Sequence, residues 1–249
     1  MRVKLQWFSR SEMGTRHSGA NQDAIWSSDD GHLCLVADGG SRPGQHAELA
    51  SSSCARVAQE LYAAAAGDDL IEGIVRRTNS ELLRRVAADE PVGTTTLAVV
   101  HLSASGRLLG AVMGDSTILR VRPDEETFTV RPLRKFDYYF TEQEPVAAAD
   151  AIFVQLPWWM RVSLTTQLPW ASQGIVPTLI DLDPQPGDTL IVCSDGVSEP
   201  VAVDRIATIA RRHAVEELPD ALIREARAAD GGDDATAAVA RWPAALGAA

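Results

Sequence analysis

Cysteine, histidine and basic residues are scarce in this chain, and each shortage excludes a class of protein. The 249 residues include three cysteines and five histidines, too few for a disulfide framework, and their spacing matches no zinc site. Cys34, Cys54 and Cys193 lie in apolar stretches, so we expect small buried side chains in a reduced protein. The net charge of −11 argues against a nucleic-acid partner, because such partners bind basic surfaces.

Long hydrophobic runs are also missing. Residues 1–9 alternate between apolar and polar types and lack the continuous apolar core of a signal peptide. No stretch approaches the roughly 20 apolar residues that a membrane-spanning helix needs. These patterns predict a cytoplasmic protein without a membrane partner.

The apolar pattern predicts strands in two groups and helices in pairs. Strands are expected at 3–8, 24–27, 33–37, 94–102, 108–113, 117–122, 127–130, 189–194 and 235–242. Helices are expected at about 46–65, from 68 or 69 to about 86, and at 204–212 and 216–229. The short connections within 94–130 favour antiparallel neighbours. One domain over residues 1–249 fits best, an α+β fold with layered sheets and an irregular, tryptophan-containing segment at about 131–186.

Five aspartates lie at predicted strand ends or in the turns beside them. They are Asp23, Asp38, Asp115, Asp195 and Asp233. An isolated Asp-Gly pair is most often a turn, but strand ends converge where sheets stack, and then these carboxylates would meet. Such a set of oxygen ligands selects Mg²⁺ or Mn²⁺. Two of these ions about 4 Å apart would clamp a phosphoryl group and generate hydroxide.

Six short motifs are spread along the chain. They are Asn21-Gln22-Asp23, Val36-Ala37-Asp38-Gly39-Gly40, Gly93-Thr94-Thr95, Gly114-Asp115-Ser116, Ser194-Asp195-Gly196 and Gly232-Asp233-Asp234-Ala235-Thr236. Each is weak alone, but in order and approximate spacing they resemble the metal-dependent type 2C (PPM) protein phosphatases, especially the bacterial branch. The resemblance implies a four-layer α-β-β-α sandwich, in which two central antiparallel sheets are flanked by helix pairs.

The same resemblance implies an activity and a ligand set. A hydroxide bridging two Mn²⁺ or Mg²⁺ ions would hydrolyse phosphoserine and phosphothreonine in proteins that a Ser/Thr kinase has phosphorylated. Asp38 would bridge both ions, and the Gly39 carbonyl would complete the coordination of one. Asp195 and Asp233 would bind the other ion.

The remaining site residues follow from the resemblance and from one departure. Asp23 would hold metal-bound water, and Asp115 with Glu199 falls where some family members bind a third, weaker ion. The family's phosphate-binding arginine is replaced by Ser18. Arg16 or His17 could reach the substrate phosphate instead, and Arg16 is the residue predicted to bind it.

Several further residues could have either a functional or a plainer structural role. Gln22 replaces the glutamate of many family members, which should weaken one ion. His17 and His46 are candidate proton donors to the leaving group, although a surface histidine is the commoner outcome. The tryptophans at 158, 159 and 170 lie in the flap-like segment and fit either a substrate lid or a buried anchor.

Two alternatives to a protein phosphatase remain at this point. The missing phosphate-site arginine would permit a metallophosphatase for a small phosphorylated metabolite. A non-catalytic pseudophosphatase that binds a regulator is the other alternative, and the presence of Asp38, Asp195 and Asp233 argues against it. The favoured prediction is an Mn²⁺/Mg²⁺-dependent protein serine/threonine phosphatase.

Overall fold

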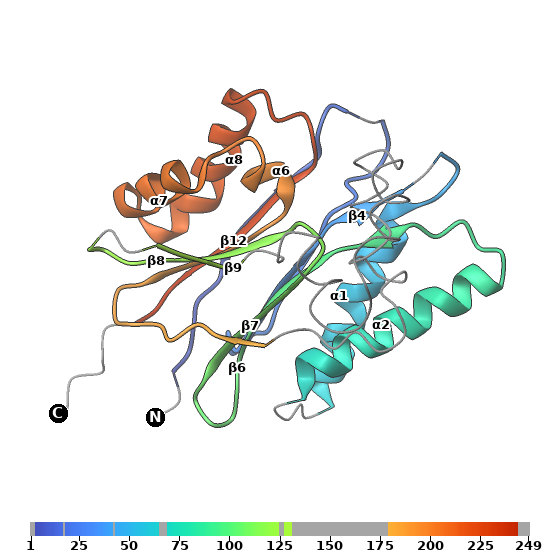
Figure 1. Cartoon of the computed structure of the whole chain (residues 1–249), viewed down its shortest axis with the longest axis horizontal. Helices are drawn as coiled ribbons and strands as arrows, with labels where there is room; N and C mark the ends of the chain where they lie inside the picture. Colours follow the sequence, from blue (N-terminus) through green and yellow to red (C-terminus); the bar gives the residue numbers. More distant parts are fainter. Residues whose placement is uncertain are drawn as a thin grey trace, which may run out of the picture.

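Two five-stranded antiparallel sheets lie face to face between two sets of helices (Figure 1). The computed structural model describes residues 3–16, 18–41, 43–64, 69–124, 127–130 and 179–243. Helices α1 and α2 cover one sheet, and α7 and α8 cover the other. The predicted α-β-β-α sandwich is therefore confirmed.

The first sheet has the strand order β10-β7-β6-β3-β2. Its strands are β2 (Ala24–Ser27), β3 (Leu33–Ala37), β6 (Leu97–Leu102), β7 (Leu108–Met113) and β10 (Ile180–Asp181). Helices α1 (Ala47–Ala63) and α2 (Leu70–Ala87) pack on its outer face. Strand side chains alternate between faces, so Leu33 and Leu35 pack against the helices, whereas Cys34 and Val36 face the second sheet.

The second sheet has the order β1-β12-β11-β8-β9. Its strands are β1 (Phe8–Glu12), β8 (Thr117–Val121), β9 (Thr127–Val130), β11 (Thr189–Cys193) and β12 (Ala235–Arg241). The outer layer consists of α6 (Asp195–Ser198), α7 (Val203–Arg212), a 3-10 helix (Val215–Glu217) and α8 (Leu218–Ala228). A separate short pair, β4 (Gly39–Gly40) and β5 (Thr94–Thr95), lies beside α1.

The first predicted strand, 3–8, is wrong in position. Pairing with β12 begins at Phe8, opposite Val239, and continues to Glu12. The preceding residues instead pack across the β2–β3 turn. There Leu5 is buried and the Trp7 indole donates a hydrogen bond to the Gly31 carbonyl at 3.0 Å.

The expected antiparallel pairing of 108–113 with 117–122 is also wrong. Strands β7 and β8 are consecutive in the chain but belong to different sheets. Gly114 lies between them at φ +86°, a backbone conformation that favours glycine, and Asp115 follows it. The connection therefore crosses from one layer to the other, although its length is typical of a hairpin.

The second helix pair differs from its prediction in two details. The helix expected at 216–229 is divided into the 3-10 helix and α8, where Pro219 occupies the first turn, a position that needs no amide donor. The short helix α6 was not expected. The three cysteines are buried as predicted, and no helix among the described residues is long and apolar enough to cross a membrane. Of the segment 131–186, residues 131–178 with the three tryptophans lie outside the described residues.

Candidate metal centre

The strand registers bring the predicted aspartates to one end of the sandwich. Ala24 pairs with Ala37, so Asp23 and Asp38, one residue beyond them, are neighbours. In the second sheet, Cys193 pairs with both Thr117 and Ala237. The segments that contain residues 115, 195 and 233 therefore meet at a common end of that sheet.

Three carboxylates from the two sheets form a close group. Asp38 follows β3, Asp115 precedes β8, and Asp195 begins α6. One oxygen from each lies within 4.8 Å of the corresponding oxygens of the other two. The structure thus brings Asp38 and Asp195 together as predicted, and it places Asp115 directly with them.

Burial and mutual repulsion raise the pKa values of Asp38 and Asp195 in this group. Burial raises the pKa of Asp38 well above its usual value, and the charges of Asp23, Asp195 and Asp115 raise it further. Burial also raises the pKa of Asp195 to about 7, with added contributions from the charges of Asp115, Asp233 and Glu199. The folded chain therefore holds carboxylates whose ionised forms are costly unless a cation compensates them.

Asp23 lies against this group with one oxygen fixed and one unsatisfied. Burial raises the pKa of Asp23 to about 6, partly opposed by hydrogen bonds from Thr236 and Ser194. The Ser194 hydroxyl donates to Asp23 Oδ2 at 2.8 Å. Oδ1 is buried and has no hydrogen-bond partner among the described residues. A buried carboxylate oxygen without a partner indicates a missing ligand, such as an ion or its water.

The ligand atoms at this centre match the preferences of a divalent metal ion. The donors are all oxygens, three lie close together, the pKa values of Asp38 and Asp195 are raised, and a fourth carboxylate has an unsatisfied oxygen. Oxygen ligands of this kind favour Mg²⁺ and Mn²⁺, whereas softer metal ions favour histidine and cysteine ligands. The residues present therefore fit such an ion.

The turn after Asp38 is fixed by backbone contacts. The Gly39 amide donates to the Gln22 carbonyl at 3.1 Å. A Cβ atom at Gly39 would lie 2.5 Å from that oxygen and 2.7 Å from the Ala47 carbonyl oxygen, so no larger residue fits. The Asp38 amide donates to Thr96 Oγ1 at 2.9 Å.

Some supporting residues were not identified from the sequence. They are Thr96 and Ser116, whose hydroxyls are 2.7 Å apart, together with Ser194 and Asp234. Ser116, Ser194 and Asp234 belong to the sequence motifs, and Thr96 follows one of them, so membership in or next to a motif was the available signal. Their partners are distant in sequence, and only the fold reveals them.

The Asp233-Asp234 pair separates into two roles. Asp234 is buried and accepts hydrogen bonds from the amides of Gly14 and Gln22, both at 2.6 Å. Asp233 is more exposed and forms an ion pair with Arg16, with 2.9 Å between Nη1 and Oδ2. Asp233 lies outside the close group of three carboxylates, although its charge acts on Asp195.

The other predicted site residues lie around this centre. Arg16 contacts Asp233, and its side chain is 59% exposed. Glu199 is exposed at the end of α6, and its charge acts on Asp195. His46 precedes α1 and is exposed, with Nδ1 3.0 Å from Glu48 Oε1. His17 lies outside the described residues.

Comparison with known proteins places this arrangement in a family. The family model described as "Protein phosphatase 2C" matches residues 13–226. The serine/threonine protein phosphatase PstP of Mycobacterium tuberculosis is 27% identical over 245 residues. That alignment covers 95% of this chain and 45% of PstP, so the chain spans a little under half the length of this curated relative.

Solved structures share the whole fold. The PPM Ser-Thr phosphatase MsPP from Mycobacterium smegmatis, in complex with cacodylate, is 26% identical with a TM-score of 0.72 over 96% of this chain and 99% of that one. The catalytic domain of PstP in complex with two manganese ions is 24% identical, also with a TM-score of 0.72, over 96% and 98% of the two chains. Since the family model matches most of the sequence, this chain belongs to the protein phosphatase 2C family.

Proposed function

We propose that this chain is an Mn²⁺- or Mg²⁺-dependent phosphatase that hydrolyses phosphoserine and phosphothreonine esters in proteins. The observation that supports this most is the close group of Asp38, Asp115 and Asp195, in which the pKa values of Asp38 and Asp195 are raised, in a chain of this family. The two manganese ions in the PstP catalytic domain support the choice of metal.

The ligand roles assigned from the sequence become proposals for these positions. Asp38 and the Gly39 carbonyl would hold one ion, and Asp38, Asp195 and Asp233 would hold a second. Asp115 would contribute to a third, weaker ion, together with Glu199. When bound, such ions lower the pKa of water and neutralise charge on a phosphoryl group.

The protein side chains supply positioning and charge. Ser194 fixes Asp23 Oδ2, which leaves Oδ1 to accept a hydrogen bond from a water at the reaction centre. Arg16 supplies a planar guanidinium at the rim, and this group can hold two phosphoryl oxygens at once. Arg16 now pairs with Asp233, which is also the proposed ligand of the second metal ion.

This role for Arg16 predicts that Arg16→Ala raises the KM for a phosphopeptide by about tenfold or more, the scale of one charge-assisted hydrogen bond. The Mn²⁺ affinity of the Arg16→Ala variant, measured by calorimetry, should equal or exceed that of the wild type, because the Arg16 guanidinium no longer competes with the metal for Asp233. Arg10→Ala, which removes the exposed ion pairs of Arg10 with Glu12 and with Asp220, is the matched control. An unchanged KM in Arg16→Ala would contradict the role.

The activity is tested with p-nitrophenyl phosphate after chelation and after addition of Mn²⁺ or Mg²⁺. Wild-type turnover should depend on the metal, and Asp38→Asn should lose at least about 10³-fold, because several kcal/mol of charge stabilisation disappear. Asp204→Asn, an exposed carboxylate on α7, should retain full activity. Metal-independent turnover, or a fully active Asp38→Asn, would refute the proposal.

Substrate class requires a second comparison. Phosphoserine and phosphothreonine peptides should be hydrolysed with a higher kcat/KM than small phosphorylated metabolites. The opposite order would favour a metabolite phosphatase. We further infer that residues 1–249 act as one domain, on proteins phosphorylated by a Ser/Thr kinase in the cytoplasm, without nucleic acid or membrane as partner.

A further inference from the structure

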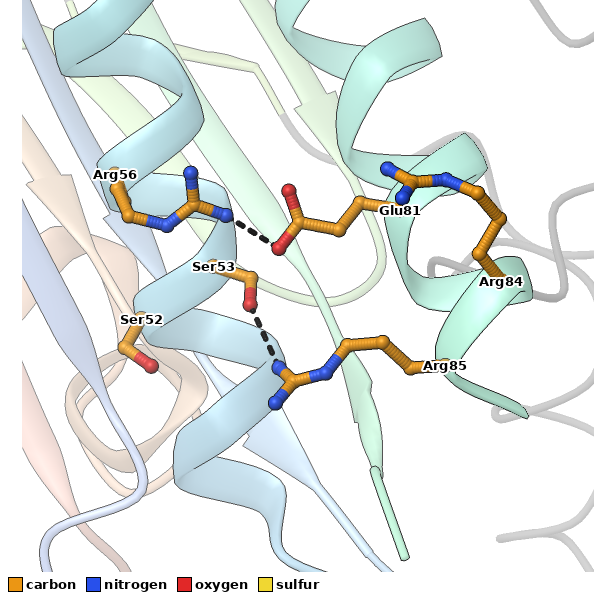
Figure 2. Close-up of a pocket in the computed structure, with 6 residues that line it drawn as sticks. All are labelled: Ser52, Ser53, Arg56, Glu81, Arg84 and Arg85. Atoms are coloured by element: carbon orange, nitrogen blue, oxygen red, sulfur yellow. Dashed lines mark hydrogen bonds and ion pairs between the residues drawn. The ribbon is translucent and has the colours of Figure 1, made fainter. Parts of the chain in front are cut away.

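A polar cavity, separate from the carboxylate group, lies between α1 and α2 (Figure 2). It is an open groove of about 610 Å³. Its lining consists of Ser52, Ser53, Arg56, Glu81, Arg84 and Arg85. No apolar or aromatic side chain is among these residues, so the groove is suited to a small polar group rather than to an organic ring system.

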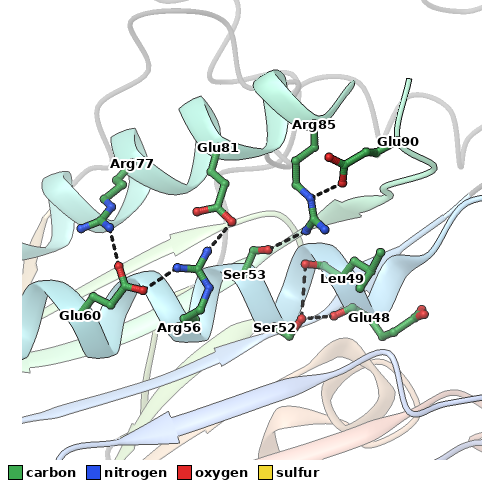
Figure 3. Close-up of polar contacts among 10 residues, drawn as sticks. All are labelled: Glu48, Leu49, Ser52, Ser53, Arg56, Glu60, Arg77, Glu81, Arg85 and Glu90. Carbon is green, nitrogen blue, oxygen red and sulfur yellow. Dashed lines mark hydrogen bonds and ion pairs between the residues drawn. The ribbon is translucent and has the colours of Figure 1, made fainter. Parts of the chain in front are cut away.

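Ion pairs across the groove neutralise its acidic residue. Arg56 on α1 binds both Glu81 on α2 and, at 2.6 Å, Glu60 on α1 (Figure 3). Arg77 on α2 also binds Glu60. Burial raises the pKa of Glu81, but the hydrogen bond and charge of Arg56 outweigh that effect and lower the pKa overall. Glu81 therefore remains ionised, and its charge is already matched by Arg56.

Arg84 and Arg85, in the last turn of α2, provide the remaining donors. Arg85 reaches across to α1, where Nη1 donates to Ser53 Oγ at 3.2 Å, and its Nε donates to Glu90 at 2.8 Å. The Arg84 guanidinium has no hydrogen bond or ion pair with any described residue. A positively charged arginine near a helix C-terminus interacts favourably with the helix dipole. That interaction does not occupy the N–H donors of Arg84.

The charge of the groove contrasts with the charge of the whole chain. Three arginines and one glutamate line it, in a protein with a net charge of −11. Arginine presents several N–H donors in a fixed plane, a geometry that matches phosphoryl oxygens. The Ser53 hydroxyl accepts a hydrogen bond from Arg85 and donates one to Glu81, so it helps to hold the groove's side chains in place.

We propose that this groove binds a phosphoryl group through Arg84 and Arg85. The site is separate from the carboxylate group, because α1 lies between the two. On the side of α1 that faces the centre, Ser51 donates to the Gln22 carbonyl at 2.6 Å, one residue from Asp23. A helix with its side chains is about 10 Å across. The proposal stands whether or not the carboxylate group is catalytic.

The test is a titration of inorganic phosphate into the chelator-treated protein, followed by amide NMR. The amides of Ser53 and Arg85 should shift, and Arg84→Ala should weaken binding by about tenfold, the scale of one charge-assisted hydrogen bond. Because the Arg84 side chain has no hydrogen bond or ion pair with the residues that the structure describes, this variant should melt at the wild-type temperature. Arg76→Ala on the same helix, whose ion pair with Glu72 lies outside the groove, should bind as the wild type does.

A second arm distinguishes the source of the phosphoryl group. A phosphoserine peptide is compared with inorganic phosphate and with the unphosphorylated peptide, again without metal. Tighter binding of the phosphopeptide, lost in Arg84→Ala, identifies a peptide-borne group, whereas equal affinity identifies free phosphate. Shifts confined to the residues around Asp38, or equal affinities in Arg84→Ala and Arg76→Ala, would overturn the proposal. None of these measurements requires catalysis, so they can fail while the phosphatase assay succeeds.

Discussion

At the scale of single residues, the environment assigns different tasks to identical side chains. Asp233 and Asp234 are adjacent and chemically alike. Asp234 is buried and anchors the loops at Gly14 and Gln22 through their amides, whereas Asp233 reaches an exposed arginine. One carboxylate therefore maintains the fold, and the other is available to a ligand.

This division predicts opposite outcomes for two alanine variants. Asp234→Ala leaves two amides without partners and should lower the free energy of unfolding by roughly 2–6 kcal/mol, at about 1–3 kcal/mol for each group. Asp233→Ala should keep the chelated protein within about 0.5 kcal/mol of wild type and should weaken Mn²⁺ binding. Urea unfolding and calorimetric titration measure the two effects. Equal losses of stability in both variants would refute the division.

At the scale of elements, backbone contacts decide which glycines are essential. Gly39 begins β4 between two carbonyl oxygens that belong to the backbone and cannot rotate away. Gly73 lies within α2, where an added Cβ would meet only Leu61 Cδ1, at an ordinary contact distance of 3.5 Å.

The two glycines therefore form a matched pair for substitution by alanine. Gly39→Ala should destabilise the protein by about 1–3 kcal/mol through overpacking and should reduce metal-dependent turnover. Gly73→Ala should stabilise it by about 0.5–1 kcal/mol, because glycine is unfavourable inside a helix. Thermal unfolding with an activity assay measures both. A Gly39→Ala variant as stable and active as wild type would show that the β3–β4 turn tolerates displacement.

Element types were more predictable from the sequence than element partners. Buried strands such as β3 and β11 are continuous apolar runs, and α1 shows helical periodicity, so local pattern sufficed. The step from β7 to β8 could not be predicted, because a short Gly-Asp connection serves a hairpin and a crossing between sheets equally well. What selects the crossing is the packing of two layers, which no local pattern contains.

At the scale of the whole molecule, crowded carboxylates couple folding to pH. Asp23 and Asp195 have folded pKa values of about 6 and about 7, above the ordinary value of 3.8. Between these limits the unfolded chain binds fewer protons than the folded chain, so the free energy of unfolding falls as pH rises. The destabilisation from these two groups is complete above about pH 7 and absent below about pH 4, and the raised pKa of Asp38 adds to it.

Without metal, the Tm should therefore decrease from about pH 5 to pH 8, and Asp195→Asn should decrease less. Each kcal/mol of relieved repulsion corresponds to about 2–4 °C at this chain length. Saturating Mn²⁺ should raise the wild-type Tm at pH 8, because it binds the ionised folded state. Scanning calorimetry of both proteins with and without chelator provides the measurement. Identical pH profiles in wild type and Asp195→Asn would contradict this account.

The sequence predicted which carboxylates meet, because strand ends marked them, and their registers confirm the shared edge. It did not predict their spacing. Asp115, expected at a weaker third position, lies within the closest group, and Asp233 lies outside it. Those distances depend on how two sheets stack, and the hydroxyls that orient the acids come from residues distant in sequence, such as Ser194, which lies 171 residues from Asp23.

The closest carboxylates come from opposite layers, Asp38 from one sheet and Asp115 and Asp195 from the other. Between those layers lie mainly aliphatic side chains. A cation bound by all three carboxylates would link the two sheets of the sandwich directly. Any sliding of one half over the other would pull its ligands apart, so occupancy of this spot would report whether the halves are aligned.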